Sequence, residues 1–156
     1  MHIMQKLNIL TCSIDELLFS NNIDLETDVV INGWVRTRRD SKAGISFITI
    51  NDGSCFQSLQ VVVQNNIDGY HSMILRLTAG SSVSVIGKLV TSSAQGQKVE
   101  LHATKIEVFG FVDDPDTYPI SSKYHTVEYL REYAHLRPRT NFFGAISRIR
   151  HCISMV

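Results

Sequence analysis

Several classes of protein are excluded by features that do not occur in this sequence of 156 residues. No run of about 18 apolar residues is present, so no membrane-spanning helix is predicted. The three cysteines, Cys12, Cys55 and Cys152, lie far apart and form no CxxC motif, which excludes a disulfide framework and a zinc-binding spacing. A reducing, cytoplasmic location without a bound metal is therefore expected.

The sequence also contains no motif that would carry catalysis. Neither the glycine-rich loops that bind nucleotide phosphates nor the GxSxG turn of a serine nucleophile is present. The six histidines are scattered, and the adjacent pair His151 and Cys152 does not have the geometry of a metal site. We therefore predict no catalytic residue and no cofactor site in this chain.

The charged residues that are present are strongly segregated. The formal net charge is zero, and the composition, with 44% hydrophobic and 19% charged residues, is typical of a globular domain. Residues 33–42 nevertheless hold four basic side chains against one acidic, and residues 123–150 hold six against two. Residues 1–32 carry five acidic side chains against one basic. A local basic patch on a neutral protein favours an anionic partner that docks in one orientation.

The middle of the chain has the pattern of a small β-barrel. Alternating apolar residues predict five short strands between about residues 28 and 111, with a helix-like stretch at 70–77 between the third and fourth. Gly33 and Gly87 lie within strands, where glycine usually marks a bulge or a sharp bend. Five bent strands with this helix describe a mainly β protein, the OB-fold Greek-key barrel. The pattern alone leaves an SH3-like or other small barrel open.

Helices are predicted on both sides of the barrel. Ser13 and Glu16 have the spacing of a capping box, which predicts a helix over 13–20. After an acidic connector, a helix is expected over 127–136, and Asn141 is expected to N-cap another that is still running at Val156. A helix cut short in this way indicates a piece of something longer. The predicted units are an N-terminal helical extension (1–27), the barrel (28–112), a hinge (113–140) and the first helix of a truncated further domain (141–156).

Strand alternation assigns a distinctive set of side chains to the outside of the barrel. If the apolar positions fill the interior, the residues that point outward are Trp34, Arg36, Arg38, Phe47, Gln60, Glu100 and His102. Arginines bind phosphates, an aromatic ring stacks on an unpaired base for about 1–3 kcal/mol, and amides and carboxylates distinguish base edges. The set predicts a surface for single-stranded RNA. The alternatives are a core position for Phe47 and a solvated end for the arginine-rich strand.

Four stretches of the sequence resemble a known enzyme family. Residues 33–47 (GWVRTRRDSKAGISF) resemble the opening of the anticodon-binding barrel of the class IIb aminoacyl-tRNA synthetases, which charge aspartate, asparagine and lysine. Residues 114–119 (DPDTYP), 128–132 (EYLRE) and above all 135–141 (HLRPRTN) resemble the asparaginyl member of that subclass. The resemblance runs from about residue 28 to the end of the chain.

The resemblance implies roles for individual residues. Phe47 would stack on the central uridine of the anticodon, Gln60 would hydrogen-bond to that uridine, and Glu100 would help to read the third anticodon base. Arg39 matches an arginine at the anticodon, whereas Arg36 and Arg38 are assigned to the basic surface without a named base. The predicted RNA-binding residues are thus Arg36, Arg38, Arg39, Phe47, Gln60 and Glu100.

The resemblance also implies what the whole enzyme would do. Its catalytic domain would follow this region, use ATP and Mg²⁺ to activate asparagine, and attach the asparagine to tRNA(Asn) in a homodimer. Residues 141–156 would be the start of that domain, and the partner of this chain would be the anticodon stem-loop alone. Three alternatives remain: an aspartate-charging relative, a stand-alone OB module that binds single-stranded nucleic acid, and a barrel face that contacts another protein.

Overall fold

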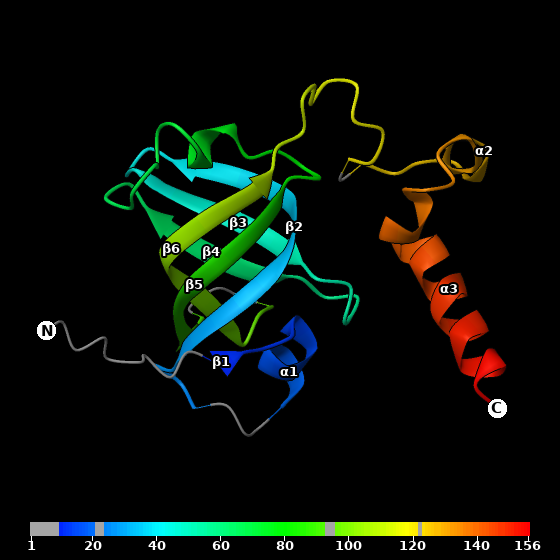
Figure 1. Cartoon of the computed structure of the whole chain (residues 1–156), viewed down its shortest axis with the longest axis horizontal. Helices are drawn as coiled ribbons and strands as arrows, with labels where there is room; N and C mark the ends of the chain where they lie inside the picture. The colour runs from blue at the N-terminus through cyan, green and yellow to red at the C-terminus, as the bar shows by residue number, and fades with distance from the viewer. Residues whose placement is uncertain (1–9, 21–23, 93–95, 122) are drawn as a thin grey trace, which may run out of the picture.

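The computed structural model describes residues 10–20, 24–92, 96–121 and 123–156, and consists of a barrel and a helical C-terminal segment beside it (Figure 1). The strands are β1 (Leu10–Thr11), β2 (Asp28–Ser41), β3 (Ile45–Asn51), β4 (Leu59–Gln64), β5 (Ser82–Thr91) and β6 (Val99–Gly110). The helices are α1 (Ile14–Phe19), η1 (Ile74–Arg76), α2 (Val127–Glu132), η2 (Arg137–Arg139) and α3 (Asn141–Ser154). Of the helices in the described ranges, none is long and apolar enough to cross a membrane.

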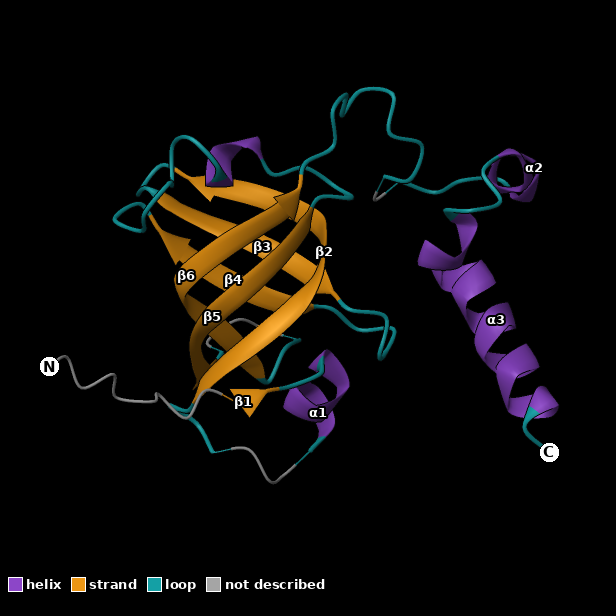
Figure 2. Ribbon diagram, viewed as in Figure 1, coloured by secondary structure: helices purple, strands orange, loops and turns teal. Residues whose placement is uncertain are grey.

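The strands β2 to β6 close into a barrel, as Figure 2 shows. The order in the sheet is β1-β2-β3-β4-β6-β5, and an additional pairing between β2 and β5 completes the closure. The pairs are antiparallel except for β1 with β2 and β4 with β6, which are parallel. This five-stranded mixed barrel confirms the predicted OB fold.

The long strand β2 pairs with two neighbouring strands, and it has a glycine at the point where its pairing partner changes. Residues 28–34 pair with β5, whereas residues 34–41 pair with β3. A Cβ atom on Gly33 would lie 2.7 Å from Cγ2 of Ile50 and 2.9 Å from the carbonyl oxygen of Asn51. The side chain of any other residue would therefore push β2 and β3 apart at this bend. Gly87 lies at a register shift between β5 and β6, as its place in the sequence predicts.

The helix predicted over 70–77 is wrong except for one turn. Residues 68–73 form turns, and only the 3₁₀ turn η1 follows. Ile74 and Leu77 are three residues apart, so a 3₁₀ turn aligns their side chains, and both are at most 1% exposed at one end of the barrel. Filling that end requires two aligned apolar side chains, which a single turn supplies.

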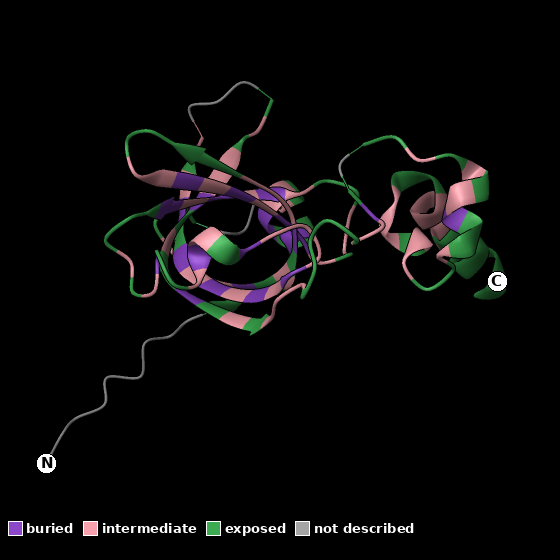
Figure 3. Ribbon diagram, turned by 90° about the horizontal axis from the view of Figure 1, so that it is seen from above, coloured by how far each residue is buried: buried purple, intermediate pink, exposed green. Residues whose placement is uncertain are grey.

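The core is formed by the side chains that strand alternation directs inward. Val29, Ile48, Val61 and Leu101 are each no more than 1% exposed, and Figure 3 shows the alternation of buried and partly exposed positions along the strands. The parity predicted for β2 to Val35, and for β3, β4 and the Leu101 region of β6, is correct. Burial of this kind contributes about 25 cal/mol for each Å² of apolar surface removed from water.

The N-terminal helix is part of this core. α1 begins with the capping box predicted at Ser13, whose hydroxyl accepts a hydrogen bond from the backbone N–H of Glu16 while the Glu16 carboxylate accepts from the backbone N–H of Ser13. Ile14 and Leu17 are buried against the strands and fill the end of the barrel opposite η1. Residues 1–9 and 21–23 of the predicted 1–27 extension lie outside the described residues.

The C-terminal helices differ from the sequence prediction at their ends. α2 stops at Glu132 rather than at residue 136, since Tyr133 has a non-helical conformation. The N-cap of α3 is Thr140 rather than Asn141, because Thr140 has an extended backbone and its hydroxyl accepts from the N–H of Phe143. α3 ends at Ser154 and does not run on to Val156.

Candidate nucleic-acid interface

Two rows of outward side chains cross the barrel, and the first row contains Phe47. Its members are joined by strand pairing: Arg39 on β2 lies opposite Phe47 on β3, Phe47 opposite Val62 on β4, Val62 opposite His102 on β6, and His102 opposite Lys88 on β5. Phe47 is only partly buried and does not belong to the core cluster. The row therefore places an accessible ring between a guanidinium group and an imidazole on the outer wall.

The second row lies beside the first and is made of polar groups. Thr37 on β2 pairs with Thr49 on β3, and the Thr37 hydroxyl donates to the Thr49 hydroxyl at 2.9 Å. Thr49 pairs with Gln60 on β4, whose amide nitrogen donates to Glu100 on β6 at 3.3 Å. Gln60 is thus a diagonal neighbour of Phe47 on the same face, a position from which long side chains interact.

Glu100 is a point where several hydrogen bonds converge. Its Oε2 accepts from the hydroxyl of Ser92 at 3.0 Å and from the amide nitrogens of Gln97 and Gln60 at 3.3 Å each. Its Oε1 lies 3.1 Å from Nε2 of His102, and the Glu100 side chain is 12% exposed. An ionised carboxylate only accepts hydrogen bonds, so it directs the NH₂ group of Gln60 toward itself. The Gln60 oxygen is then the end of the amide that is left as an acceptor.

The outward orientation predicted for Arg38 is wrong. A bulge between Val35 and Thr37 reverses the alternation, so Arg38 lies opposite the inward-facing Ile48. The Arg38 guanidinium donates to the carbonyl oxygens of Ile74 at 3.1 Å and Leu77 at 2.9 Å, and its other terminal nitrogen lies 3.2 Å from the Asp40 carboxylate. Arg38 therefore holds η1 onto the end of the barrel.

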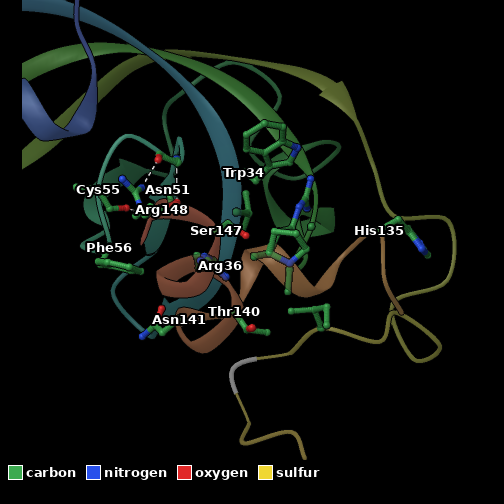
Figure 4. Close-up of a pocket in the computed structure, with 18 of the residues that line it drawn as sticks. Trp34, Arg36, Asn51, Cys55, Phe56, His135, Thr140, Asn141, Ser147 and Arg148 are labelled. Carbon is green, nitrogen blue, oxygen red and sulfur yellow. Dashed lines mark hydrogen bonds between the residues drawn. The ribbon is translucent and has the colours of Figure 1, made fainter. Parts of the chain in front are cut away.

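Arg36, the residue in the bulge, lies apart from the two rows. Its side chain lines a cavity between the barrel and α3, together with Trp34 and Arg139 (Figure 4). Burial, and then the positive charge of Arg139, lower the pKa of the Arg36 guanidinium below its ordinary value. Of the six predicted RNA-binding residues, the structure brings four together on one face, namely Arg39, Phe47, Gln60 and Glu100.

The rows also contain residues to which sequence reasoning assigned no role. His102, expected to point outward, belongs to the first row and lies 3.1 Å from Glu100 of the second row, and Lys88 on β5 extends the first row. A hollow of about 600 Å³ is lined by Val62, Lys88 and His102, among others, and continues the first row. Lys88 precedes the inward-facing Leu89, so the alternation of β5 is the signal that would have identified it.

No metal site accompanies these rows in the part of the chain that the structure describes. No group of three or more histidine, cysteine, aspartate or glutamate residues there is arranged to hold a metal ion. Cys12, Cys55 and Cys152 are all free. The side chains of the two rows offer stacking, hydrogen bonding and charge attraction.

Comparison with protein families and curated sequences gives consistent matches. Residues 29–109 match the family described as OB-fold nucleic acid binding domain. The chain is 56% identical over 142 residues to the asparagine–tRNA ligase of Actinobacillus pleuropneumoniae serotype 3, covering 91% of this chain and 30% of that protein. It is 63% identical over 126 residues to the asparagine–tRNA ligase of Haemophilus influenzae strain Rd, covering 81% of this chain and 27% of that protein. The chain thus spans about 30% of the length of the curated relatives it matches.

Solved structures give the same likeness in three dimensions. The asparaginyl-tRNA synthetase from Pyrococcus horikoshii superposes with a TM-score of 0.75 at 25% identity, covering 96% of this chain and 34% of that chain. The same enzyme complexed with asparaginyl-adenylate gives a TM-score of 0.71 at 26% identity, covering 83% of this chain and 30% of that chain. The similarity therefore extends past the barrel into the C-terminal helices.

Proposed function

Because the chain belongs to the family of OB-fold nucleic acid binding domains, and is homologous to the N-terminal region of asparagine–tRNA ligases, we propose that its outer barrel face binds the anticodon loop of tRNA(Asn). The observation that carries this proposal is the cross-strand pair of Arg39 and Phe47, with the hydrogen-bonded pair of Gln60 and Glu100 in the next row. A cation, an accessible ring and an oriented amide thus meet on one surface.

Phe47 supplies the platform on which an unpaired base stacks. Its neighbours across the strands are Arg39 on one side and Val62 on the other, so a base lying against the ring has a guanidinium group within reach of its phosphate. Base–aromatic stacking is worth about 1–3 kcal/mol for each base and tolerates any sequence. Stacking and phosphate binding therefore give affinity, whereas selectivity for one base must come from the polar side chains of the second row.

Gln60 makes that choice because Glu100 fixes its amide. With its nitrogen turned to the carboxylate, the amide offers an oxygen acceptor to the incoming base. The N3 position of uracil is an N–H donor, whereas the N3 of cytosine is an acceptor and would face the Gln60 oxygen unfavourably. The arrangement favours uridine at the centre of the anticodon. Glu100 acts through Gln60 in this step, and its assigned contact with the third base remains part of the proposal.

The wider activity is proposed for the full-length enzyme. It would activate asparagine with ATP and Mg²⁺ in the cytoplasm, transfer it to tRNA(Asn), and act as a homodimer. The identity of 56–63% to asparagine–tRNA ligases favours asparagine over aspartate as the amino acid. We assign no ATP-binding or catalytic residue to this chain, whose part is to hold the anticodon.

The stacking role is tested by titrating the chain with an anticodon stem-loop of tRNA(Asn). Phe47→Ala should weaken binding by about tenfold or more, since one stacked base is lost. Phe109→Ala is the matched control, because Phe109 is a 63% exposed phenylalanine at the end of β6, away from both rows. Equal affinity of the two variants would exclude Phe47 as the platform.

The base-reading role is tested by changing the central uridine of the stem-loop to cytidine. This change should weaken binding to the unmodified chain far more than binding to Gln60→Ala. Glu100→Gln should also narrow the difference between uridine and cytidine, because an amide at position 100 both donates and accepts and no longer fixes Gln60. Equal losses in all three proteins would remove Gln60 from recognition.

A further inference from the structure

A second site lies between the barrel and the C-terminal helices, away from the two rows. It is a cavity of about 690 Å³, within the range of about 300–1,000 Å³ typical of small-molecule sites. The barrel contributes Trp34, Arg36 and the loop between β3 and β4, and the facing wall comes from residues 118–121 and from η2 and α3 (Figure 4). Aromatic and apolar side chains thus form much of a pocket that is large enough for a nucleotide.

The charged groups that line this cavity have one sign. Three arginines, Arg36, Arg139 and Arg148, line it, and among the described residues its lining contains no aspartate or glutamate. The first turn of α3 also borders the cavity and adds the partial positive charge of a helix N-terminus. A half-enclosed space with several cations and no carboxylate strongly favours an anion.

Two of the three arginines are held in place by the protein. The Arg139 guanidinium lies 4.7 Å from the centre of the Trp34 ring and donates to the Tyr118 hydroxyl at 3.0 Å. Arg148 donates to the carbonyl oxygens of Gly53 and Ser54 and stacks over Phe56. Both guanidinium groups are therefore fixed at the cavity wall and retain N–H groups beyond those used in these bonds.

Arg36 differs from the other two arginines of the cavity in its lack of a hydrogen-bonding or acidic partner among the described residues. Within the described residues it forms neither a hydrogen bond nor an ion pair, although it is half-buried beside Arg139. Burial and Arg139 both lower the pKa of Arg36, which means that its charged form is destabilised where it stands. A bound anion would remove this penalty by pairing with both guanidinium groups.

We propose that this cavity binds a small phosphorylated molecule of nucleotide size, with its phosphate between Arg36 and Arg139. A guanidinium group matches a phosphate with two parallel N–H···O bonds, and two such groups suit a phosphate that carries two negative charges. The aromatic and apolar wall accommodates the remainder of the ligand. This site goes beyond the anticodon proposal and does not depend on it, because none of Arg39, Phe47, Gln60 and Glu100 lines the cavity.

The chain contains a reporter at the site, since Trp34 is its only tryptophan. Titration with inorganic pyrophosphate and with AMP, followed by tryptophan fluorescence, should give a saturable change, whereas adenosine and an equal ionic strength of sodium chloride should give none. Arg36→Met should weaken pyrophosphate binding by about tenfold or more, as expected for loss of charge-assisted hydrogen bonds. Arg76→Met is the control, because it removes an arginine that lies outside the lining, where it stacks on the Phe111 ring.

The same titrations contain the results that would overturn the proposal. An absence of saturable change with pyrophosphate and AMP, or an equal response of Arg36→Met and Arg76→Met, would exclude the site. Circular dichroism checks that each variant is folded. If Arg36→Met does not fold, Arg139→Met removes the other arginine proposed to bind the phosphate and is tested in its place. Displacement of pyrophosphate by the anticodon stem-loop would assign the phosphate to RNA and would also overturn a separate small-molecule site.

Discussion

The barrel strands and the helix α3 both carry apolar residues at a regular period, every second residue in the strands and every third or fourth in the helix, but only the barrel buries them. In the barrel, inward residues such as Ile48 and Val61 are at most 1% exposed. Five strands surround them, and the buried side chains of α1 and η1 cover the two ends of the barrel. In α3, Ile146, Ile149 and Ile153 recur at helical spacing but are 37%, 60% and 70% exposed. An apolar period therefore predicts a helix or strand without showing that its face is covered within the same unit.

The two regions also differ in what holds them. The barrel depends on pairing between residues far apart in the sequence, whereas α3 contacts the barrel through Gly144 and Arg148. Arg148 bonds to the loop between β3 and β4, and a Cβ atom on Gly144 would lie 3.5 Å from the Phe56 ring. We therefore expect the barrel to unfold as one unit and α3 to respond separately.

The largest difference in unfolding free energy should appear when an isoleucine is replaced by alanine in each of the two regions. Ile48→Ala should lower the free energy of unfolding by about 2–5 kcal/mol, because it leaves a cavity in the closed core. Ile153→Ala should change it by no more than about 0.5 kcal/mol, because that side chain is mostly exposed. Urea unfolding measured by far-UV circular dichroism gives both values. Similar losses would show that α3 is packed as tightly as the barrel.

The next largest effect distinguishes Arg38 from its neighbour Arg39, because only one of the two should matter for stability. Arg38→Met should cost about 1.5–3 kcal/mol, because the carbonyl oxygens of Ile74 and Leu77 lose a charged donor. Arg39→Met should leave the unfolding free energy nearly unchanged and reduce affinity for the anticodon stem-loop. Urea unfolding and RNA binding are measured on both variants, so that the effect on stability and the effect on affinity can be assigned to different arginines. A loss of RNA binding without loss of stability in Arg38→Met would contradict the role assigned to Arg38.

A smaller and pH-dependent effect is expected where α1 is attached to the barrel. Burial raises the pKa of Asp52, but hydrogen bonds from the Ser54 hydroxyl and from the backbone N–H groups of Ile14 and Ser54 outweigh it and hold the pKa below its ordinary value. A carboxylate with a lowered pKa adds stability above its unfolded-state pKa of about 3.9, and that stability is lost as the pH falls through the folded-state value.

Asp52→Asn should therefore destabilise the chain by about 1 kcal/mol at pH 7, since the charged acceptor of the α1 N-terminus is partly exposed and screened. The difference from the unmodified chain should shrink as the pH falls below the unfolded-state pKa of about 3.9, and disappear once Asp52 is protonated in the folded chain as well. Thermal unfolding of both proteins between pH 7 and pH 2.5 measures it. A difference that does not change with pH would show that the charge contributes nothing.

The smallest global effect is expected at the contact between the two regions. Arg148→Met removes the bonds to Gly53 and Ser54 but no core contact, so the main unfolding transition should shift by less than about 1 kcal/mol. Amide hydrogen exchange in α3 should accelerate, whereas exchange in β3 and β4 should not. Faster exchange in the strands as well would mean that α3 stabilises the whole barrel.

Much of the fold follows from local patterns in the sequence. The strand bounds and the inward positions are predictable because alternation is regular in β3, β4 and near Leu101. The same regularity placed Phe47, Gln60 and Glu100 outside. The predicted helix at residues 70–77 failed because tertiary packing at the barrel end needs only one turn.

The errors in the candidate site have a different origin. Arg38 was assigned to the wrong side because a bulge at Arg36 reverses the alternation, and that bulge is defined by pairing with β3. The donors to Glu100 are Gln60 on β4, which lies 40 residues earlier in the chain, and Ser92 and Gln97 in the hairpin between β5 and β6, so strand alternation does not indicate that they meet. The cationic cavity joins Arg36 to residues about a hundred positions later in the chain.

The row that contains Phe47 sets a geometric condition on what can lie along it. Arg39, Phe47 and Val62 stand on adjacent strands, and adjacent strands are about 4.8 Å apart. Nucleotides stacked in a helical strand rise only about 3.4 Å each. A nucleic acid that placed one base on each strand would be stretched beyond its helical rise, so its bases must separate first. If the outer face binds the anticodon loop as proposed, an opened loop fits this spacing and a pre-stacked loop does not.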